Sequence, residues 1–131
     1  MALKIKFRAL LTMCGDPIEN GELVIDDGRV VAISTQPGAS EDVLDLSDCL
    51  LMPGFVNAHC HLSLTALEKK LSPSNSFADW IRALIPLNAD LDEESRMRGI
   101  RAGAEAMKRS GVTTLADYVA DPELLPVIGG L

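Results

Sequence analysis

Two histidines separated by one residue are the side chains of this sequence best suited to chemistry. His59 and His61 are the only histidines of the 131-residue chain, and they follow an apolar stretch that begins at Pro53. In a β-strand successive side chains point to opposite faces, so both imidazoles would lie on one face and Cys60 on the other. Two neutral imidazoles on one face can bind a divalent metal ion such as Zn²⁺ or Fe²⁺. The spacing therefore predicts a metal site, with a pair of structural histidines in the core as the alternative.

Three short segments of the chain carry a likeness to known proteins. They are residues 53–62 (PGFVNAHCHL), residues 76–81 (SFADWI) and residues 110–117 (SGVTTLAD). In order and spacing they resemble the first barrel strand, the helix that follows it and the second barrel strand of the amidohydrolase superfamily, in its cytosine deaminase and chlorohydrolase-like branch. The resemblance covers nearly the whole chain, but only as the N-terminal third of such an enzyme. Many relatives carry an acidic residue where this chain has Ser63, a departure that concerns substrate contacts more than metal binding.

The resemblance implies a metal-dependent hydrolase with a small-molecule substrate, a Zn or Fe cofactor, and His59 and His61 as metal ligands. In such an enzyme a metal-bound hydroxide attacks a ring carbon or an amide carbonyl, and hydrolytic deamination of an amino-substituted heterocycle is the expected reaction. Hydrolysis of a cyclic amide, as in dihydroorotase-, hydantoinase- or imidazolonepropionase-like enzymes, is the alternative. The remaining ligands and the catalytic acid and base come from later barrel strands in that family. No catalytic residue is therefore assigned in this chain, which is expected to be inactive alone.

Three other residues are candidates for the site. Ser63 and Trp80 are candidate substrate contacts, although packing in the core is the favoured role for the only tryptophan of the chain. Asp117 ends the second expected barrel strand, where it would either orient an imidazole from behind the metal or serve as a helix cap or loop acid, the favoured alternative. The polar connection over residues 63–75 is longer than usual between strand and helix, which predicts a lid over the site.

The pattern of elements predicts an α/β protein with a β-sandwich part. Residues 1–52 are expected to form the N-terminal part of a small β-sandwich, and residues 53–131 the first two βα units of an incomplete TIM-type (β/α)₈ barrel. Alternating apolar and basic residues over 3–12 predict a strand rather than a signal peptide. In the first part, turns are expected at residues 15–17, at residues 20–21, at Asp27-Gly28 as a type I′ hairpin turn, and at Ser47-Asp48 between two strand segments.

Two helices are expected after residue 75. Ser76 is the predicted N-cap of the first, which should end at or before Pro86 because proline lacks an N–H. Asp92 is the predicted N-cap of the second, and Gly111 should follow its C-terminus. Within the second helix, the small residues Gly99 and Gly103 are expected to allow a close approach to the sheet.

Length and charge narrow the possible functions. A complete barrel takes about 250 residues, so 131 residues cannot form one. A net charge of −7 repels phosphate backbones, which argues against nucleic acid as a partner, and no apolar run is long enough to cross a membrane. The three cysteines show no CxxC spacing, which favours a reducing compartment and hence the cytoplasm.

Three hypotheses on the state of the chain stay open at this point. It is a fragment or truncated product of a larger enzyme, a subunit of a split enzyme completed by a partner chain, or a non-enzymatic module that shares the first barrel strands. In the first two cases a missing C-terminal portion or partner would complete the barrel. An unclosed sheet exposes strand edges, so self-association into a homo-oligomer is also expected of the isolated chain.

Overall fold

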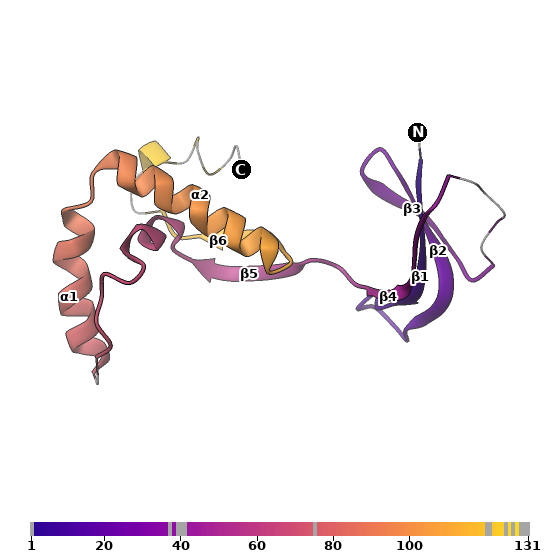
Figure 1. The fold of residues 1–131 in the computed structure, drawn as a ribbon, viewed down its shortest axis with the longest axis horizontal. Coiled ribbons are helices and arrows are strands. Elements are labelled where there is room, and N and C mark those ends of the chain that lie inside the picture. The colour runs from indigo at the N-terminus through magenta and orange to yellow at the C-terminus, as the bar shows by residue number, and fades with distance from the viewer. Residues whose placement is uncertain are drawn as a thin grey trace. The chain divides into compact units, whose positions relative to one another are not determined.

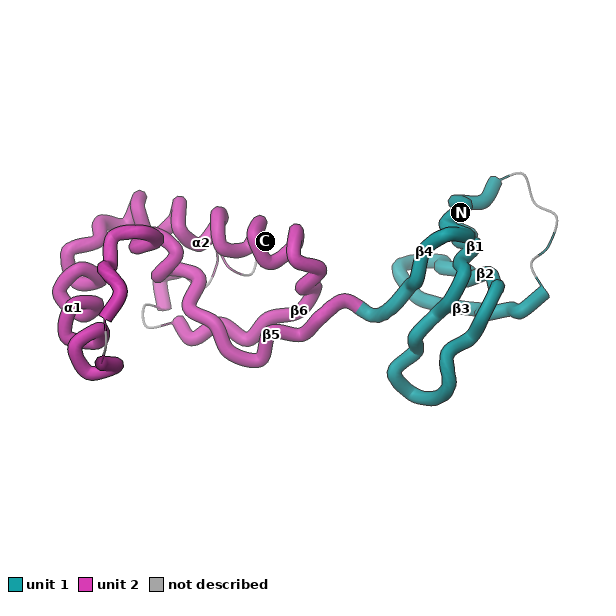
Figure 2. Tube along the Cα trace, turned by 60° about the horizontal axis from the view of Figure 1, so that its bottom comes forward, with its two compact units in different colours: residues 1–53 teal, residues 54–131 magenta. Residues whose placement is uncertain are grey.

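The chain folds into two compact units, residues 1–53 and residues 54–131, which Figure 2 shows in different colours. Strands make up the first unit and both strands and helices the second (Figure 1), so the predicted α/β class is confirmed. No described helix is long and apolar enough to span a membrane. The computed structural model describes residues 2–36, 38, 42–74, 76–119, 122–124, 126 and 128.

The first unit is a 4-stranded mixed sheet with the strand order β3-β2-β1-β4. β1 lies antiparallel to β2 and parallel to β4, and β2 and β3 form a hairpin. Phe7, in the middle of β1, is 2% exposed and is the centre of this unit's packing. The strands are β1 (Leu3–Leu10), β2 (Ile18–Asp26), β3 (Arg29–Ser34) and β4 (Leu44–Leu51).

The turn chemistry of β2 was predicted correctly at one end and wrongly at the other. Asp27 and Gly28 have φ angles of 48° and 69°, the positive values that a type I′ turn requires, and the hairpin between β2 and β3 is confirmed. The turn expected at Asn20 and Gly21 is absent from the structure, since both residues lie inside β2. Asn20 does have a positive φ of 52°, but the register with β1 is the same on both sides of it. A single left-handed residue therefore bends the strand without ending it.

β4 is one strand and not the two predicted segments. Ser47 and Asp48 lie where its pairing with β1 shifts register, between Leu46 and Leu50. Asp45 Oδ1 accepts hydrogen bonds from the backbone N of Ser47 (2.9 Å) and from its Oγ (2.5 Å). These bonds hold the pKa of the Asp45 carboxyl below its usual value. The polar residues thus produce an irregularity of the kind seen in β-bulges, and the strand continues past it.

The second unit contains a 2-stranded parallel sheet of β5 and β6. Phe55 lies opposite Val112 at one end of the sheet and Cys60 opposite Asp117 at the other, so the C-terminal ends of both strands meet. A buried cluster beside the sheet contains Cys60, Leu62, Ile100 and Leu124. The elements are β5 (Phe55–Cys60), η1 (Leu62–Leu67), α1 (Phe77–Ala89), α2 (Glu93–Arg109), β6 (Val112–Asp117) and η2 (Pro122–Leu124).

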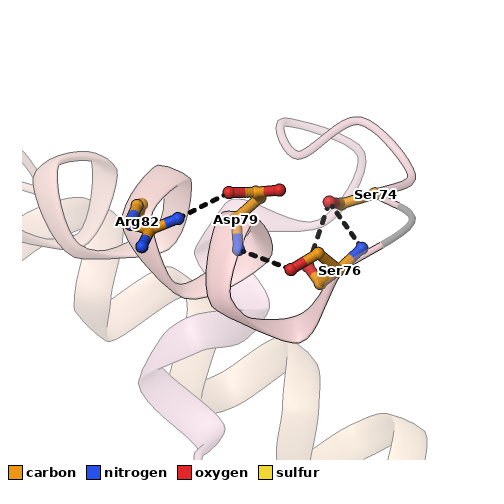
Figure 3. Close-up of polar contacts among 4 residues, drawn as sticks. All are labelled: Ser74, Ser76, Asp79 and Arg82. Atoms are coloured by element: carbon orange, nitrogen blue, oxygen red, sulfur yellow. Dashed lines mark hydrogen bonds and ion pairs between the residues drawn. The ribbon is translucent and has the colours of Figure 1, made fainter.

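The start of α1 follows the prediction. Ser76 Oγ accepts a hydrogen bond from the backbone N of Asp79 at 3.4 Å, so the predicted N-cap is confirmed (Figure 3). Arg82 Nη1 donates to Asp79 Oδ1 at 2.7 Å one turn later, and Ser74 Oγ contacts the backbone of Ser76. This network defines the first turn of the helix.

The end of α1 does not follow the prediction, because the helix runs through Pro86 to Ala89. Proline removes one backbone donor from the helix and crowds the carbonyl one turn earlier. Its own carbonyl still accepts, and Asp90 N donates to it at 3.0 Å. One lost hydrogen bond near the C-terminus therefore weakens the helix locally, and the last turn still closes behind the proline.

The polar connection predicted as a lid over residues 63–75 is partly helical. η1 occupies residues 62–67, with Leu62 and Leu67 buried at 2% and 4% exposure. Asn75 lies outside the described residues. The periodic leucines of this segment pack a short helix against α2, so the part of it next to the strand is anchored and is not a free lid.

α2 has both predicted ends. Asp92 Oδ1 accepts from the backbone N of Ser95 at 2.6 Å, which also lowers the pKa of the Asp92 carboxyl, and Gly111 follows the helix with a φ of 80°. The helix approaches η1, however, and not the sheet, through its two glycines. A Cβ on Gly99 would lie 2.7 Å from the backbone N of Ala66, and one on Gly103 would lie 2.7 Å from Thr65 Oγ1.

The contact between α2 and η1 leads to a test at Gly99. In a free helix, alanine is about 1 kcal/mol more favourable than glycine. We expect Gly99→Ala to lower the free energy of unfolding by about 1–3 kcal/mol instead, because the new methyl group collides with the backbone of η1. Urea unfolding checks this, with Gly15→Ala as the control, since a Cβ there meets nothing within 4 Å. An increase in stability for Gly99→Ala would contradict the contact.

Candidate metal centre and adjoining cavity

The two imidazoles converge at the C-terminal end of β5. His59 Nε2 and His61 Nε2 lie 3.2 Å apart, and the rings meet edge to face with their planes at 83°. Both side chains are exposed, so they do not form the pair of core histidines that was the alternative prediction. His59 belongs to β5 and His61 immediately follows it, in agreement with the alternation that placed them on one face.

The distance between the two nitrogens fits a shared metal ion. A tetrahedral zinc ion with Zn–N bonds of about 2.0–2.1 Å separates two ligating nitrogens by about 3.3 Å. The observed 3.2 Å between the Nε2 atoms matches that separation. Within the described part of the chain, no group of three or more His, Cys, Asp or Glu side chains comes together. Among the described residues, His59 and His61 are thus a pair of candidate donors.

The side chain of Asn57 holds the backbone of His59. Asn57 Oδ1 accepts a hydrogen bond from the backbone N of His59 at 3.2 Å, and Asn57 Nδ2 lies 3.5 Å from Met107 Sδ on α2. Asn57 thus links the strand segment that carries His59 to α2.

Cys60 points away from the imidazoles, as predicted. Its side chain is in the buried cluster at 8% exposure, and Sγ lies 3.6 Å from the carbonyl O of Ala116 and 3.5 Å from Asp117 Oδ1. Burial, with the neighbouring Asp117 carboxylate as a further cause, raises the pKa of the Cys60 thiol to about 11. The thiol therefore stays protonated at neutral pH, where it can donate a hydrogen bond but is a poor metal ligand or nucleophile.

Asp117 ends β6, opposite Cys60 in the neighbouring strand. Its Oδ1 accepts a hydrogen bond from the backbone N of Leu62 at 2.9 Å, in addition to the contact with the Cys60 thiol. Its hydrogen bonds in the described structure go to these two residues and to neither imidazole. Asp117 thus satisfies the first N–H of η1, a capping role close to the favoured prediction, but does so from a neighbouring strand.

A cavity of about 200 Å³ adjoins His61 in the second unit. Ser63 lines it together with His61, so the structure brings these two predicted site residues to one cavity. Trp80 is not among its lining residues; it is partly exposed and stacks on Phe77 with ring centroids 5.9 Å apart. The lining residues are His61, Ser63, Leu64, Leu84, Ile85, Asn88, Arg96, Tyr118 and Leu124.

Sequence reasoning missed three polar residues of this cavity. The Tyr118 ring lies 5.5 Å from that of His61 at an angle of 69°, and its position directly after the end of β6 could have indicated it. Arg96 Nη1 donates to Asn88 Oδ1 at 2.9 Å, and its Nη2 donates to the carbonyl O of Asn88. This pair joins α1 to α2 across the turn between them, and no periodic pattern in the sequence signals it.

The fold and the paired histidines define an α/β protein with two exposed imidazoles at the end of a parallel strand. The family model of the Amidohydrolase family matches residues 50–127. The chain therefore belongs to the amidohydrolase family, and the resemblance seen in its three sequence segments is confirmed.

Individual relatives agree with this assignment. The chain is 33% identical over 115 residues to 5-methylthioadenosine/S-adenosylhomocysteine deaminase of Halobacterium salinarum, a match that covers 85% of this chain and 26% of the relative. It is 34% identical over 117 residues to 5'-deoxyadenosine deaminase of Methanosarcina barkeri, covering 86% and 27%. The chain thus spans about a quarter of the length of these relatives.

Part of a solved structure has the fold of this chain. The crystal structure of an adenosine deaminase from Xanthomonas campestris with bound zinc matches with a TM-score of 0.83 and 21% sequence identity, over 98% of this chain and 30% of that one. At this identity the match concerns the fold alone.

The orientation of Cys60 can be tested by alkylation. Cys14 is exposed, whereas Cys60 is buried and has a raised pKa, so little reactive thiolate forms at pH 8. We expect iodoacetamide to label Cys14 in the folded protein far faster than Cys60, and both at similar rates in urea, as followed by mass spectrometry. Equal labelling of the two residues in the folded state would show that Cys60 faces solvent.

Proposed function

We propose that the full-length gene product is a metal-dependent hydrolase that acts on C–N bonds other than peptide bonds and deaminates an amino-substituted heterocycle. The observation that carries the proposal is the 3.2 Å approach of His59 Nε2 to His61 Nε2 beside a cavity, in a chain of the amidohydrolase family. This chain supplies the opening part of the site. The coding sequence after Leu131 distinguishes a longer chain from a partner subunit as the source of the rest of the site.

The finer description of the fold is part of the proposal. We infer that β5 and β6 are the first two strands of a TIM-type (β/α)₈ barrel, and that the sheet of residues 1–52 is part of a small β-sandwich. The parallel pairing of β5 and β6 and the likeness to the adenosine deaminase structure support this. Active sites of such barrels lie at the C-terminal ends of the strands, which is where His59, His61 and Asp117 are found.

His59 and His61 would hold the metal through their Nε2 atoms. A bound divalent ion, Zn or Fe, would supply Lewis acidity and lower the pKa of water so that it can attack at neutral pH. The residues of this chain would hold the substrate beside it: Ser63 and Tyr118 offer hydroxyl groups, while Leu64, Leu84 and other apolar side chains of the cavity exclude water. The acid and base that move protons would come from outside this chain.

The relatives narrow the substrate class. Both matched relatives are named as deaminases of adenosine derivatives. We therefore propose an aminopurine nucleoside, in which water adds to the ring carbon that bears the amino group and ammonia leaves. A small molecule is the only partner the reaction requires, and we place the protein in the cytoplasm. No finding favours the cyclic amide alternative, so it enters only as an outcome of the activity test.

The metal site is tested by removing each imidazole in the full-length protein. We expect His59→Ala and His61→Ala each to abolish stoichiometric metal as measured by elemental analysis, because a single imidazole from this chain leaves the site without its paired donor. Cys14→Ala is the control, since it removes an exposed potential ligand far from the pair in sequence. Full metal content in both histidine variants would contradict the assignment.

The reaction is tested by measuring ammonia. We expect the full-length protein to release ammonia from adenosine derivatives such as 5'-deoxyadenosine and 5-methylthioadenosine, and more slowly from aminopyrimidines and aminotriazines. The histidine variants serve as controls and should release none. Turnover of a hydantoin or lactam ring without ammonia release from any of these compounds would overturn the choice of deamination.

A further inference from the structure

The residues on both sides of His61 contact one carboxylate oxygen. Asp117 Oδ1 accepts from the backbone N of Leu62 at 2.9 Å and lies 3.5 Å from the Cys60 thiol. Cys60 and Leu62 are the immediate neighbours of His61 and are both buried, whereas His61 is exposed between them. The imidazole therefore projects from a short backbone segment whose two flanks are attached to the end of β6.

Two backbone hydrogen bonds also hold the segment around His61, at atoms other than those that contact Asp117. The carbonyl of Cys60 accepts from the backbone N of Tyr118 at 2.9 Å, and the carbonyl of His61 accepts from the backbone N of Leu64 at 3.0 Å. His61 has φ −138° and ψ 79°, outside the helical region, and makes no side-chain cap for η1. Its conformation marks the change from strand to helix, where the N–H of Leu62 finds its partner in the Asp117 carboxylate.

We propose that Asp117 is a positioning residue for the metal site, which orients the His61 imidazole toward His59 by holding the Cys60 thiol and the backbone N–H of Leu62. This inference rests on the proposed function, because it assumes that the histidine pair binds a metal ion. Asp117 would act without touching the metal, the substrate or either imidazole. The approach of the two Nε2 atoms to 3.2 Å would then depend on where this carboxylate lies.

The alternative is that Asp117 acts by its charge, since a carboxylate near a cation attracts it wherever the oxygen points. The two roles make different demands on the side chain. A positioning role needs an acceptor oxygen at this distance from the Leu62 N–H, whether or not it is charged. An electrostatic role needs the charge and tolerates a shift of the oxygen.

Zinc binding by the full-length protein separates these roles. We measure the Kd for Zn²⁺ by competition with a chelator in wild type, Asp117→Ala, Asp117→Asn and Asp117→Glu. We expect Asp117→Ala to bind zinc roughly 10–100-fold more weakly, as is typical when a residue supporting a metal ligand is lost. Asp117→Asn keeps the acceptor and should retain more affinity than Asp117→Glu, which keeps the charge but displaces the oxygen.

The matched control is Asp92→Ala. Asp92 also accepts a backbone N–H at the start of a helix, that of Ser95 at 2.6 Å, but it is the N-cap of α2 and neither histidine is among its contacts. Its loss should lower the melting temperature, as loss of a cap does, and leave the Kd for zinc unchanged. A loss of zinc affinity equal to that of Asp117→Ala would mean that general destabilisation, and not positioning, weakens the site, and would overturn the inference.

A second readout does not depend on activity. The absorption spectrum of the Co²⁺-loaded protein reports the arrangement of its ligands, and we expect it to change in Asp117→Ala and in Asp117→Glu but not in Asp92→Ala. If Asp117→Ala does not fold, the order of Asp117→Asn and Asp117→Glu still decides, and tighter binding by Asp117→Glu would overturn the inference. Wild-type affinity in all three Asp117 variants would overturn it too, while a wild type that binds no zinc would overturn the proposed function itself.

Discussion

The pairing of β5 with β6 is the constraint on which the candidate site depends. Parallel strands place their C-terminal ends at one edge, and the register that sets Cys60 opposite Asp117 brings the histidine pair and this carboxylate to the same place. Because side chains alternate along the strand, the imidazoles lie on one face, and the Cys60 thiol lies on the other, in the cluster with Leu62 and Ile100. A shift of one residue in this register would bury the histidines and expose the thiol.

η1 packs closely against α2, and this contact anchors the segment next to the C-terminal end of β5. Gly99 and Gly103 leave no room for a side chain, so the backbone of η1 lies directly on α2. Leu62, the first residue of η1, is at once a part of the buried cluster, a neighbour of His61 and the donor to Asp117. The exposed end of β5 is thereby attached to buried residues of η1, α2 and η2. Such an attachment suits a site that holds its residues in place while it stays open to solvent.

The parts that could be predicted from the sequence are those fixed by local chemistry. Asp27-Gly28 specifies its turn by the need for positive φ, Ser76 and Asp92 specify helix starts by their side-chain oxygens, and the spacing of His59 and His61 specifies one shared face. Local signals failed where the surroundings decide. Asn20 resembles a turn residue, but its neighbours Glu19 and Gly21 pair with β1 in one register. Pro86 resembles a helix end but keeps its acceptor for Asp90.

The cavity beside His61 could not be predicted from the sequence, because contacts between separate elements form it. Arg96 and Asn88 meet because the turn between α1 and α2 folds one helix back against the other, and no periodicity records such a contact. Ser63 and Tyr118 reach the cavity only because η1 and β6 begin and end beside the same histidine. A spacing can therefore predict a pair of candidate metal donors, since His59 ends one strand and His61 directly follows it. The groups that surround the donors come from separate elements, so their identity follows from the tertiary fold and must be read from the structure.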